Sequence, residues 1–270
     1  MVVAEYKGFD WLAGYDRLLR TSNLDPLTVL SAALPANETD RPVLLSLAEA
    51  LAEPDRLRQL LIQEYPYTTE PRLQRAGLSV LHQDLALSVI APLTLRLFRD
   101  GRTHLPDPSR IFLTPPSNAN APSRWLHLPA GTTVGVDEFV AETTGLLNGW
   151  YPVFRKSLGV SPGAYWSSVA LALAAPFSAV WNLAEPPSVC TLAQAWLEQF
   201  DCDSHRYVDW IPATFNGQQC AIPQRRGCCL KYLLPDGGYC GTCGIYRKAR
   251  MDAACRPSRG QGPEQWQPGQ

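Results

Sequence analysis

Four cysteines lie close together near the carboxyl end of the chain, in the stretch RRGCCLKYLLPDGGYCGTCGIY. Cys228 and Cys229 are adjacent, and ten residues later Cys240 and Cys243 follow with two residues between them. Neighbouring side chains of an extended chain point to opposite faces, so two adjacent thiols reach one site only where the backbone turns. Gly227 and the run PDGG can supply such turns, and the glycines after Cys240 and Cys243 permit a tight loop. The spacing therefore predicts a small loop-built module around one site.

The rest of the composition favours a metal or redox site over a disulfide framework. The amino terminus, MVVAEYKGFDWLAGYDRLL, has no basic segment followed by an apolar stretch and a cleavage site, which predicts a cytoplasmic protein with reduced thiols. With 25 acidic and 24 basic residues, the formal charge is −1. A global field that would recruit nucleic acid is thereby excluded, and any charged ligand must be met by local side chains.

The C-x2-C spacing of Cys240 and Cys243 is compatible with several chemistries. Two thiolates at this spacing can bind zinc or an iron–sulfur cluster, and the same spacing occurs in redox dithiols. Structural zinc sites use two spaced pairs, so an adjacent pair such as Cys228–Cys229 is atypical for them. Four thiolates are the set that a [2Fe–2S] cluster requires. The cluster is the leading interpretation, and a zinc-stapled interaction module and a reversible thiol sensor stay open.

The pattern C-C-x10-C-x2-C after a double arginine resembles the carboxyl-terminal motif of the FhuF-type ferric siderophore reductases. Cys228, Cys229, Cys240 and Cys243 match it one for one, and the resemblance covers under a tenth of the chain. It implies that these cysteines bind a [2Fe–2S] cluster. It further implies an enzyme, an iron–sulfur oxidoreductase that reduces the Fe(III) of a siderophore, of hydroxamate type, by one electron and releases Fe(II) in the cytoplasm.

The implied partners are the ferric siderophore and an external electron donor such as a ferredoxin or a reductase. No G-x-G-x-x-G element lies between a strand and a helix, so we do not expect the chain to bind NAD(P)H itself. We expect a monomer that does not bind nucleic acid. A peripheral location at the inner membrane, beside an importer, is left open as an alternative to the free cytoplasm.

Basic and aromatic side chains are candidates for contact with the substrate. Arg225 and Arg226 could attract an anionic ferric complex or stabilise the reduced cluster, or they could be a solvated pair beside a turn. Lys231, in the connecting loop, has the same two interpretations. Trp150 and Arg155, in NGWYPVFRKSLG, could line a pocket for a bulky ferric complex, although such aromatic residues more often belong to the core.

The aromatic residues near the motif, the histidines and the remaining cysteines have simpler interpretations. Three aromatic residues flank the motif and either exclude water from it or only pack: Trp210, Tyr232 and Tyr239. The histidines have no mutual metal-ligand spacing and are expected at the surface or satisfied in the core: His82, His104, His127 and His205. The other cysteines match no metal pattern: Cys190, expected to be a buried hydrophobe, Cys202, Cys220 and Cys255, expected to be a loop thiol.

The remaining pattern predicts a helix-rich α+β fold, with a mainly helical body, a small β hairpin or sheet and the loop-built module. Leu-rich segments broken by prolines precede Asp100, and the longest predicted helix runs from Pro71 to Phe98. Its buried face is expected to carry Leu78, Leu81, Leu85 and Val89. Further helices are predicted at Asp137–Leu147, Pro162–Trp181 and Thr191–Phe200.

Two short β-like runs, Ile111–Thr114 and Trp125–Leu128, predict a hairpin, and YVDWIPATF predicts a last strand before the cysteines. The uncharged stretch Ser157–Ala184 is expected to be a buried core helix and not a membrane span, because Pro162 and Pro176 interrupt it. We divide the chain into a siderophore-binding body at 1–215, a cluster module at 216–256 and a disordered tail at 257–270.

Overall fold

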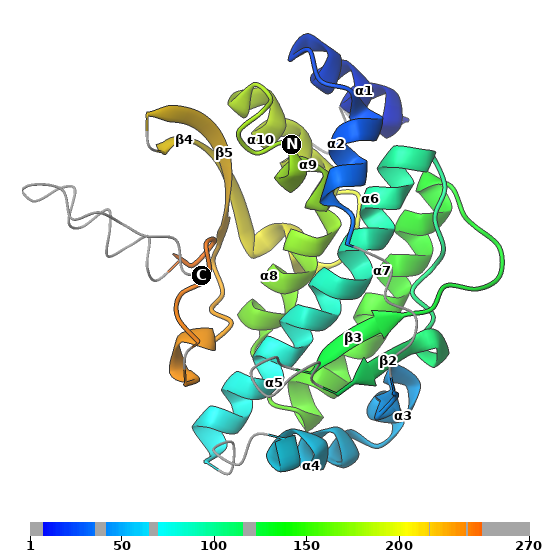
Figure 1. The fold of residues 1–270 in the computed structure, drawn as a ribbon, viewed down its shortest axis with the longest axis vertical. Coiled ribbons are helices and arrows are strands. Elements are labelled where there is room, and N and C mark those ends of the chain that lie inside the picture. Colours follow the sequence, from blue (N-terminus) through cyan, green and yellow to red (C-terminus); the bar gives the residue numbers. More distant parts are fainter. Residues whose placement is uncertain are drawn as a thin grey trace, which may run out of the picture.

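The computed structural model describes residues 8–35, 42–64, 70–115, 123–215, 217–235 and 237–244. Helices dominate this part of the chain and two small antiparallel sheets accompany them, which confirms the helix-rich α+β prediction (Figure 1). Cys255 and the predicted tail, 257–270, lie outside the described residues.

A long central helix runs through the molecule, and α8 packs along it (Figure 1). It consists of α5 (Pro71–Leu85), the π-helical turn η2 (Ala86–Ile90) and α6 (Ala91–Asp100). The wider turn directly precedes Pro92, whose missing N–H interrupts the regular ladder. The predicted helix is confirmed, and its predicted face is buried: Leu78, Leu81, Leu85 and Val89.

This central helix is also long and apolar enough, by length and composition, to cross a membrane. However, 72% of its most apolar window is buried inside the protein. A mostly buried helix of this kind is what the core of a globular fold requires, because its apolar face packs on protein. We therefore describe Pro71–Asp100 as the core helix.

Helix α8 (Pro162–Leu173) packs against α5, η2 and α6 and is buried on every face from Ala164 onward. It begins where Ser161 accepts a hydrogen bond from the Ala164 N–H, at 3.1 Å, and Pro162 occupies its first turn. The helix predicted for Pro162–Trp181 ends earlier, at Leu173, and the short α9 (Ala175–Ala179) follows with Pro176 in its first turn. The expectation of a buried core helix in this uncharged stretch is confirmed.

The other helices cover the two ends and the far side of this pair. They are α1 (Trp11–Thr21), α2 (Pro26–Ala33), α3 (Leu47–Ala52), α4 (Pro54–Glu64), α7 (Val136–Pro152) with its π-helical end η4 (Val153–Ser157), and α10 (Pro186–Leu197). An aromatic cluster joins α1 and α10 to the core through edge-to-face contacts, among them Trp11 with Trp196 at 5.3 Å between ring centroids.

The first sheet has the order β1–β2–β3 and is antiparallel throughout: β1 (Leu45–Ser46), β2 (Ile111–Thr114) and β3 (Arg124–His127). Phe112 lies opposite Leu126 in the β2–β3 pair, so the predicted hairpin is confirmed. The sheet is fixed to the core helix by Asp84, whose carboxylate accepts a hydrogen bond from the Trp125 N–H at 2.9 Å.

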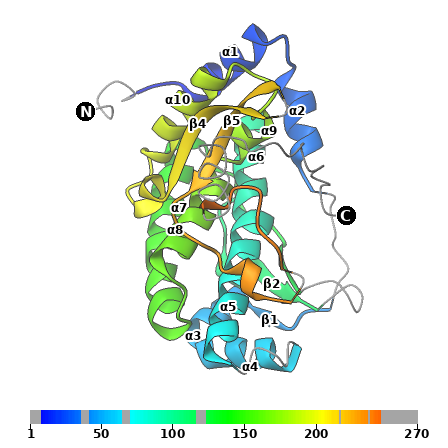
Figure 2. The ribbon, with the colours of Figure 1, turned by 90° about the vertical axis from the view of Figure 1, so that its left-hand side faces the viewer.

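The second sheet is a hairpin of β4 (Val208–Phe215) and β5 (Gln218–Arg225) that packs on α10. Strand β4 was predicted and β5 was not, because QQCAIPQR combines polar residues with a proline and has little strand propensity of its own. The pairing of β5 with β4 crosses the division that we expected at residue 215. Strand β5 ends at Arg225 and delivers the chain directly into the cysteine module, which then runs along the α5 side of the molecule (Figure 2).

Candidate metal centre

The structure brings the four cysteines of the motif into one small module. The Sγ atoms of Cys229 and Cys240, eleven residues apart in sequence, lie 4.0 Å from each other. Cys228 is near enough to Cys240 and Cys243 for their charges to interact. All four are free thiols; Cys229 and Cys243 are buried, and Cys228 and Cys240 are partly exposed. The module therefore places a set of four thiols between the interior and the surface.

The backbone turns that this arrangement needs are present. Leu230 adopts the left-handed conformation, with φ of 61°, and its N–H points to the Cys228 Sγ at 3.3 Å. Gly238, in the run PDGG, also has a positive φ, of 59°. The second pair is turned by a hydrogen bond from the Cys243 N–H to the Cys240 carbonyl at 2.9 Å. Two adjacent thiols can thus serve one site because the chain reverses immediately after them.

Two glycines allow the module to close against its neighbours. A Cβ on Gly227 would lie 2.0 Å from the carbonyl oxygen of Gly163 in α8, and a Cβ on Gly244 would lie 2.3 Å from the carbonyl oxygen of Arg225. Gly241 has no atom within 4 Å of such a Cβ, so the predicted need for glycine holds at 244 and not at 241. The contact of Gly227 with Gly163 fixes the module to the start of α8.

Arg225 is buried, with 1% of its surface exposed, so the interpretation of a solvated arginine pair is wrong for this residue. Its Nε donates to the Ser167 hydroxyl at 2.9 Å, and its Nη2 donates to the Ser168 hydroxyl at 2.6 Å. Arg226 is exposed, and its guanidinium makes a two-fold contact with the Asp209 carboxylate, at 2.6 and 2.7 Å. The two arginines therefore have opposite environments.

Cys229 and Cys240 affect each other's ionisation through the contact between their Sγ atoms. The contact with Cys240 and, to a smaller extent, the Arg225 guanidinium outweigh the effect of burial and lower the pKa of Cys229 to about 6. The same contact raises the pKa of Cys240. Burial raises the pKa of Cys228, while Arg225 opposes that increase. The thiolate is the form that binds metal, so the contact with Cys240 and the Arg225 charge both favour the ligand form of Cys229.

The donor set fits a metal centre, although the four thiols are gathered in one module and not converged on one point. Among the described residues, no three His, Cys, Asp or Glu side chains form a ready group of metal ligands. Two thiolates on one tetrahedral ion, with metal–sulfur bonds of about 2.3 Å, lie about 3.8 Å apart. The 4.0 Å between Cys229 and Cys240 is close to that separation. Cys228 and Cys243 belong to the same module, which therefore supplies the four thiols that a [2Fe–2S] cluster requires.

The aromatic residues near the motif differ in role. The rings of Tyr232 and Tyr239, both in the loop between the two cysteine pairs, stack with centroids 5.5 Å apart. Trp210 instead lies buried on β4, with Phe177 at 6.5 Å, and belongs to the hydrophobic core. Trp210 therefore packs in the core, and shielding of the cysteines by Tyr232 and Tyr239 stays a prediction.

The histidines do not contribute to the module. His82, in α5, is buried and stacks on Tyr165 at 4.3 Å, and its Nδ1 has no hydrogen-bond partner, so the expectation of a satisfied core histidine is wrong there. Burial, with a smaller effect of the Arg225 charge, lowers the pKa of His82 to about 3. This imidazole is therefore neutral at physiological pH.

The predicted substrate residues are scattered. Trp150 is buried in the core, which agrees with the packing interpretation, while Arg155 and Lys231 are exposed on η4 and on the short 3-10 helix η6 (Lys231–Leu233). A shared pocket of Trp150 and Arg155 is not formed. Of the remaining cysteines, Cys190 is buried as expected, and burial raises its pKa to about 11. Cys220 is also buried, and Cys202 is partly buried.

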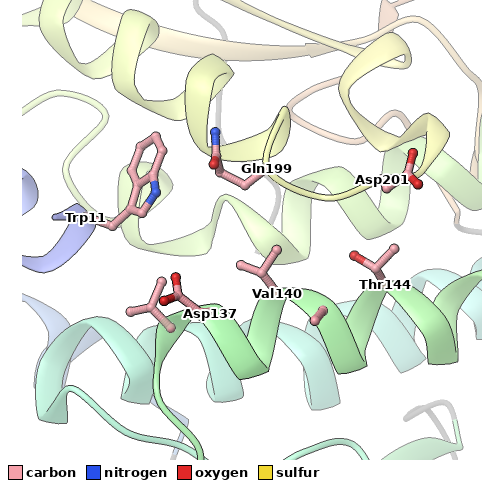
Figure 3. A pocket seen from close by; sticks show the side chains of 8 residues that line it. Trp11, Asp137, Val140, Thr144, Gln199 and Asp201 are labelled. Carbon is pink, nitrogen blue, oxygen red and sulfur yellow. The ribbon is translucent and has the colours of Figure 1, made fainter. Parts of the chain in front are cut away.

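A cavity of about 420 Å³ that sequence reasoning missed opens between α1, α7 and the segment that follows α10 (Figure 3). Its lining residues are Trp11, Val136, Asp137, Val140, Ala141, Thr144, Gln199 and Asp201. The α7 members recur at three- and four-residue steps, which is the signal of one helix face. None of these residues belongs to the cysteine module.

Residues 225–243 match the family model of the FhuF 2Fe-2S C-terminal domain. The match begins at Arg225 and ends at Cys243, so it contains the four cysteines and the two glycine turns between them. It indicates a [2Fe–2S] cluster as the cofactor and supports an iron–sulfur protein of the siderophore–iron reductase-like kind. Searches of curated proteins and of solved structures returned no match.

Proposed function

Because residues 225–243 form a FhuF 2Fe-2S C-terminal domain, we propose that the protein is a ferric siderophore reductase. The observation that carries the proposal is the module of four free cysteines at the edge of a helical body, two of them buried and two partly exposed. Cys228, Cys229, Cys240 and Cys243 would hold the [2Fe–2S] cluster. When bound, such a cluster supplies single-electron transfer at the low potential typical of an all-cysteine ligand set.

The proposed substrate is the Fe(III) complex of a hydroxamate siderophore. Anionic oxygen ligands hold the smaller, harder Fe(III) ion far more tightly than Fe(II). One electron from an external donor is taken up by the ferric ion, the oxygen ligands take up protons from water, and Fe(II) dissociates. No side chain is needed as a catalytic acid or base, so the work of the protein is positioning and tuning.

The module presents residues suited to an anionic complex. The partly exposed Cys228 and Cys240 mark the side of the site that faces solvent, and the stacked Tyr232 and Tyr239 lie beside them. Lys231 is exposed at the same place and makes no ion pair within the described part of the chain. We assign contact with the ferric complex to this face, in place of the earlier candidates Trp150 and Arg155.

The electron donor in this proposal is a separate protein, such as a ferredoxin, because the sequence holds no dinucleotide-binding fingerprint. We place the reaction in the cytoplasm, or at the inner face of the membrane where an imported complex arrives. A monomer suffices, since the four cysteines come from one chain.

The test is purification without oxygen, followed by iron, sulfide and zinc analysis and a visible spectrum. We expect two irons and two sulfides per chain, and visible bands that bleach with dithionite and return when a ferric hydroxamate is added. A chelator specific for Fe(II) should trap one Fe(II) for each cluster reoxidised. Cys→Ser variants at the four motif positions should lose these properties, whereas Cys190→Ser, at a buried thiol outside the module, should keep them.

Two outcomes would contradict the proposal. A colourless protein with one zinc per chain would support a structural zinc module instead. If the protein holds a [2Fe–2S] cluster but its reduced form is not reoxidised by ferric hydroxamate, the proposed cofactor is supported and the proposed substrate is wrong.

A further inference from the structure

The strongest unexplained feature of the structure is the buried charge of Arg225. An arginine keeps its proton under all ordinary conditions, and burying it without a counter-ion carries a large desolvation cost. Among the described residues no carboxylate pairs with it, and its Nη1 has no hydrogen-bond partner. Its other contacts are neutral oxygen atoms of α8: the Ser167 and Ser168 hydroxyls and, at 3.4 Å, the Ala164 carbonyl.

These oxygens hold the guanidinium but do not neutralise it. The Ser167 hydroxyl donates its proton to the Gly163 carbonyl at 2.5 Å, and the Ser168 hydroxyl donates to the Ala164 carbonyl at 2.8 Å. Both hydroxyls therefore present lone pairs to Arg225, in one fixed orientation. An arrangement that fixes a positive charge without cancelling it is suited to an anion on the other side of the group.

The charged and titratable groups around Arg225 leave one source for that anion. On α5, His82 is neutral, and the Asp84 carboxylate is bound to the Trp125 N–H and faces Arg124. The remaining groups within reach of the Arg225 charge are the module cysteines Cys228, Cys229 and Cys240. The backbone agrees with this placement, since the Arg225 N–H donates to the Thr242 carbonyl, between the second pair of cysteines, at 3.2 Å.

We propose that Arg225 is the built-in counter-charge of the [2Fe–2S] cluster, a positioning residue held by Ser167 and Ser168 that raises the reduction potential of the cluster and helps to retain it. Four thiolates and two sulfides outweigh the positive charge of two ferric ions, and reduction adds a further negative charge. A fixed cation nearby stabilises the reduced form more than the oxidised one, and burial makes its effect strong. The inference rests on the proposed function only through the cluster, and not through the substrate.

The two arginines of the motif act differently in this account because strand β5 sends successive side chains to opposite faces. Arg225 points inward to α8, while Arg226 points outward to Asp209. An exposed, paired charge is screened by salt and contributes little. Arg226 is therefore a matched control for Arg225, adjacent in sequence and equal in charge.

The experiment measures the midpoint potential of the purified cluster protein, by redox titration of its visible bands, at low and high salt. Arg225→Gln should lower the equilibrium constant for one-electron reduction at least tenfold, which corresponds to about 59 mV, and the shift should persist at high salt. Arg226→Gln should change it less than threefold, and any change should vanish at high salt. Ser167→Ala with Ser168→Ala, which frees the guanidinium, should shift the potential in the same direction as Arg225→Gln.

Each alternative result decides the question. An Arg225→Gln protein that keeps its cluster and its potential overturns the inference, and so does an equal shift in Arg226→Gln. If Arg225→Gln assembles no cluster, Arg225→Lys becomes decisive. This variant keeps the positive charge and should therefore keep the cluster. Loss of the cluster in Arg225→Lys would show that Arg225 acts through packing and not through its charge. Reoxidation by ferric hydroxamate is assayed separately, so failure of the proposed substrate leaves this result readable.

Discussion

Gly163 and Gly227 show how two residues without side chains determine the closest approach between the module and the body. Their backbones come so near that a single added carbon on Gly227 would overlap the Gly163 carbonyl. Cys228 and Cys229 follow Gly227 directly in the sequence, so this contact helps to place both of them. A position that looks like a turn residue in the sequence is therefore a packing residue in the structure.

Gly227→Ala should consequently destabilise the protein and reduce its cluster content. Overpacking of this kind typically costs about 1–3 kcal/mol, and here the neighbouring atoms are backbone and cannot rotate away. Thermal unfolding and iron content per chain measure the two effects. Gly241→Ala is the matched control, because its added carbon meets no atom within 4 Å and should leave both values unchanged.

His82 predicts a dependence of stability on acid. Its pKa in the folded protein is about 3, below its value of about 6.5 in the unfolded chain. A group with a depressed pKa contributes to the free energy of unfolding at pH values above its unfolded pKa. That contribution is lost as the pH falls from 6.5 toward 3. The loss at pH 4 relative to pH 7 should be about 3 kcal/mol. His82→Phe, which keeps a ring against Tyr165 but cannot titrate, should show a smaller fall in urea unfolding between these pH values. An unchanged fall would contradict the assignment.

At the scale of elements, the first residues of α8 are important for the position of the cysteine module. Helix α8 begins with a Ser161 cap two residues before Gly163, so the first turn of this helix carries the module contact and the Ser167–Ser168 pair follows in the next turn. The arrangement of the cysteine module therefore depends on the first turn of α8 being well formed.

Ser161→Ala should remove about 1 kcal/mol of stability, the usual cost of a lost helix cap, and should also lower cluster retention. Ser46, which caps α3 through a reciprocal contact with Glu49, is the comparison. Ser46→Ala should cost about as much in chemical unfolding but leave cluster retention unchanged, since α3 packs mainly on α4 and on the first sheet. Equal retention in both variants would show that α8 does not support the site.

The elements that the sequence predicted correctly are those with a strong local signal. The periodic leucines of Pro71–Phe98 and the β-branched and aromatic residues of the β2–β3 pair specify their own structure. Strand β5 could not be found in this way, because QQCAIPQR becomes a strand only by pairing with β4 and packing on α10. The inward direction of Arg225 was hidden for the same reason, since it depends on that strand.

At the scale of the whole molecule, the cysteine module lies outside the hydrophobic core. The buried core is built from the body helices and the β4–β5 hairpin, and the motif cysteines are absent from it. The grouping of the four cysteines in one module could be predicted from their spacing, because it depends on a short stretch of the chain, and their role as cluster ligands stays a prediction. Whether Trp150 and Arg155 form a pocket could not be predicted in this way, because the folding of α7 buries one residue and exposes the other.

Removal of the cluster should therefore leave the body folded. Treating the protein with an iron chelator under denaturant-free conditions should abolish the visible bands while far-ultraviolet circular dichroism stays within about a tenth of its starting value, since helices dominate that signal and lie outside the module. Brief proteolysis should then cut after Arg226 and spare the helices. A cooperative loss of helical signal together with the colour would show that the body depends on the cluster.

The module uses few groups of α8: the backbone of one glycine and the lone pairs of two serines. All three residues lie within the segment SPGAYWSS at the start of the helix. A set of contacts this small can be built into another protein. A designer who wrote this helix start into an unrelated helical bundle, and joined the twenty residues from Arg225 to Gly244 through a short hairpin, would have the parts for transplanting the centre together with its own counter-charge.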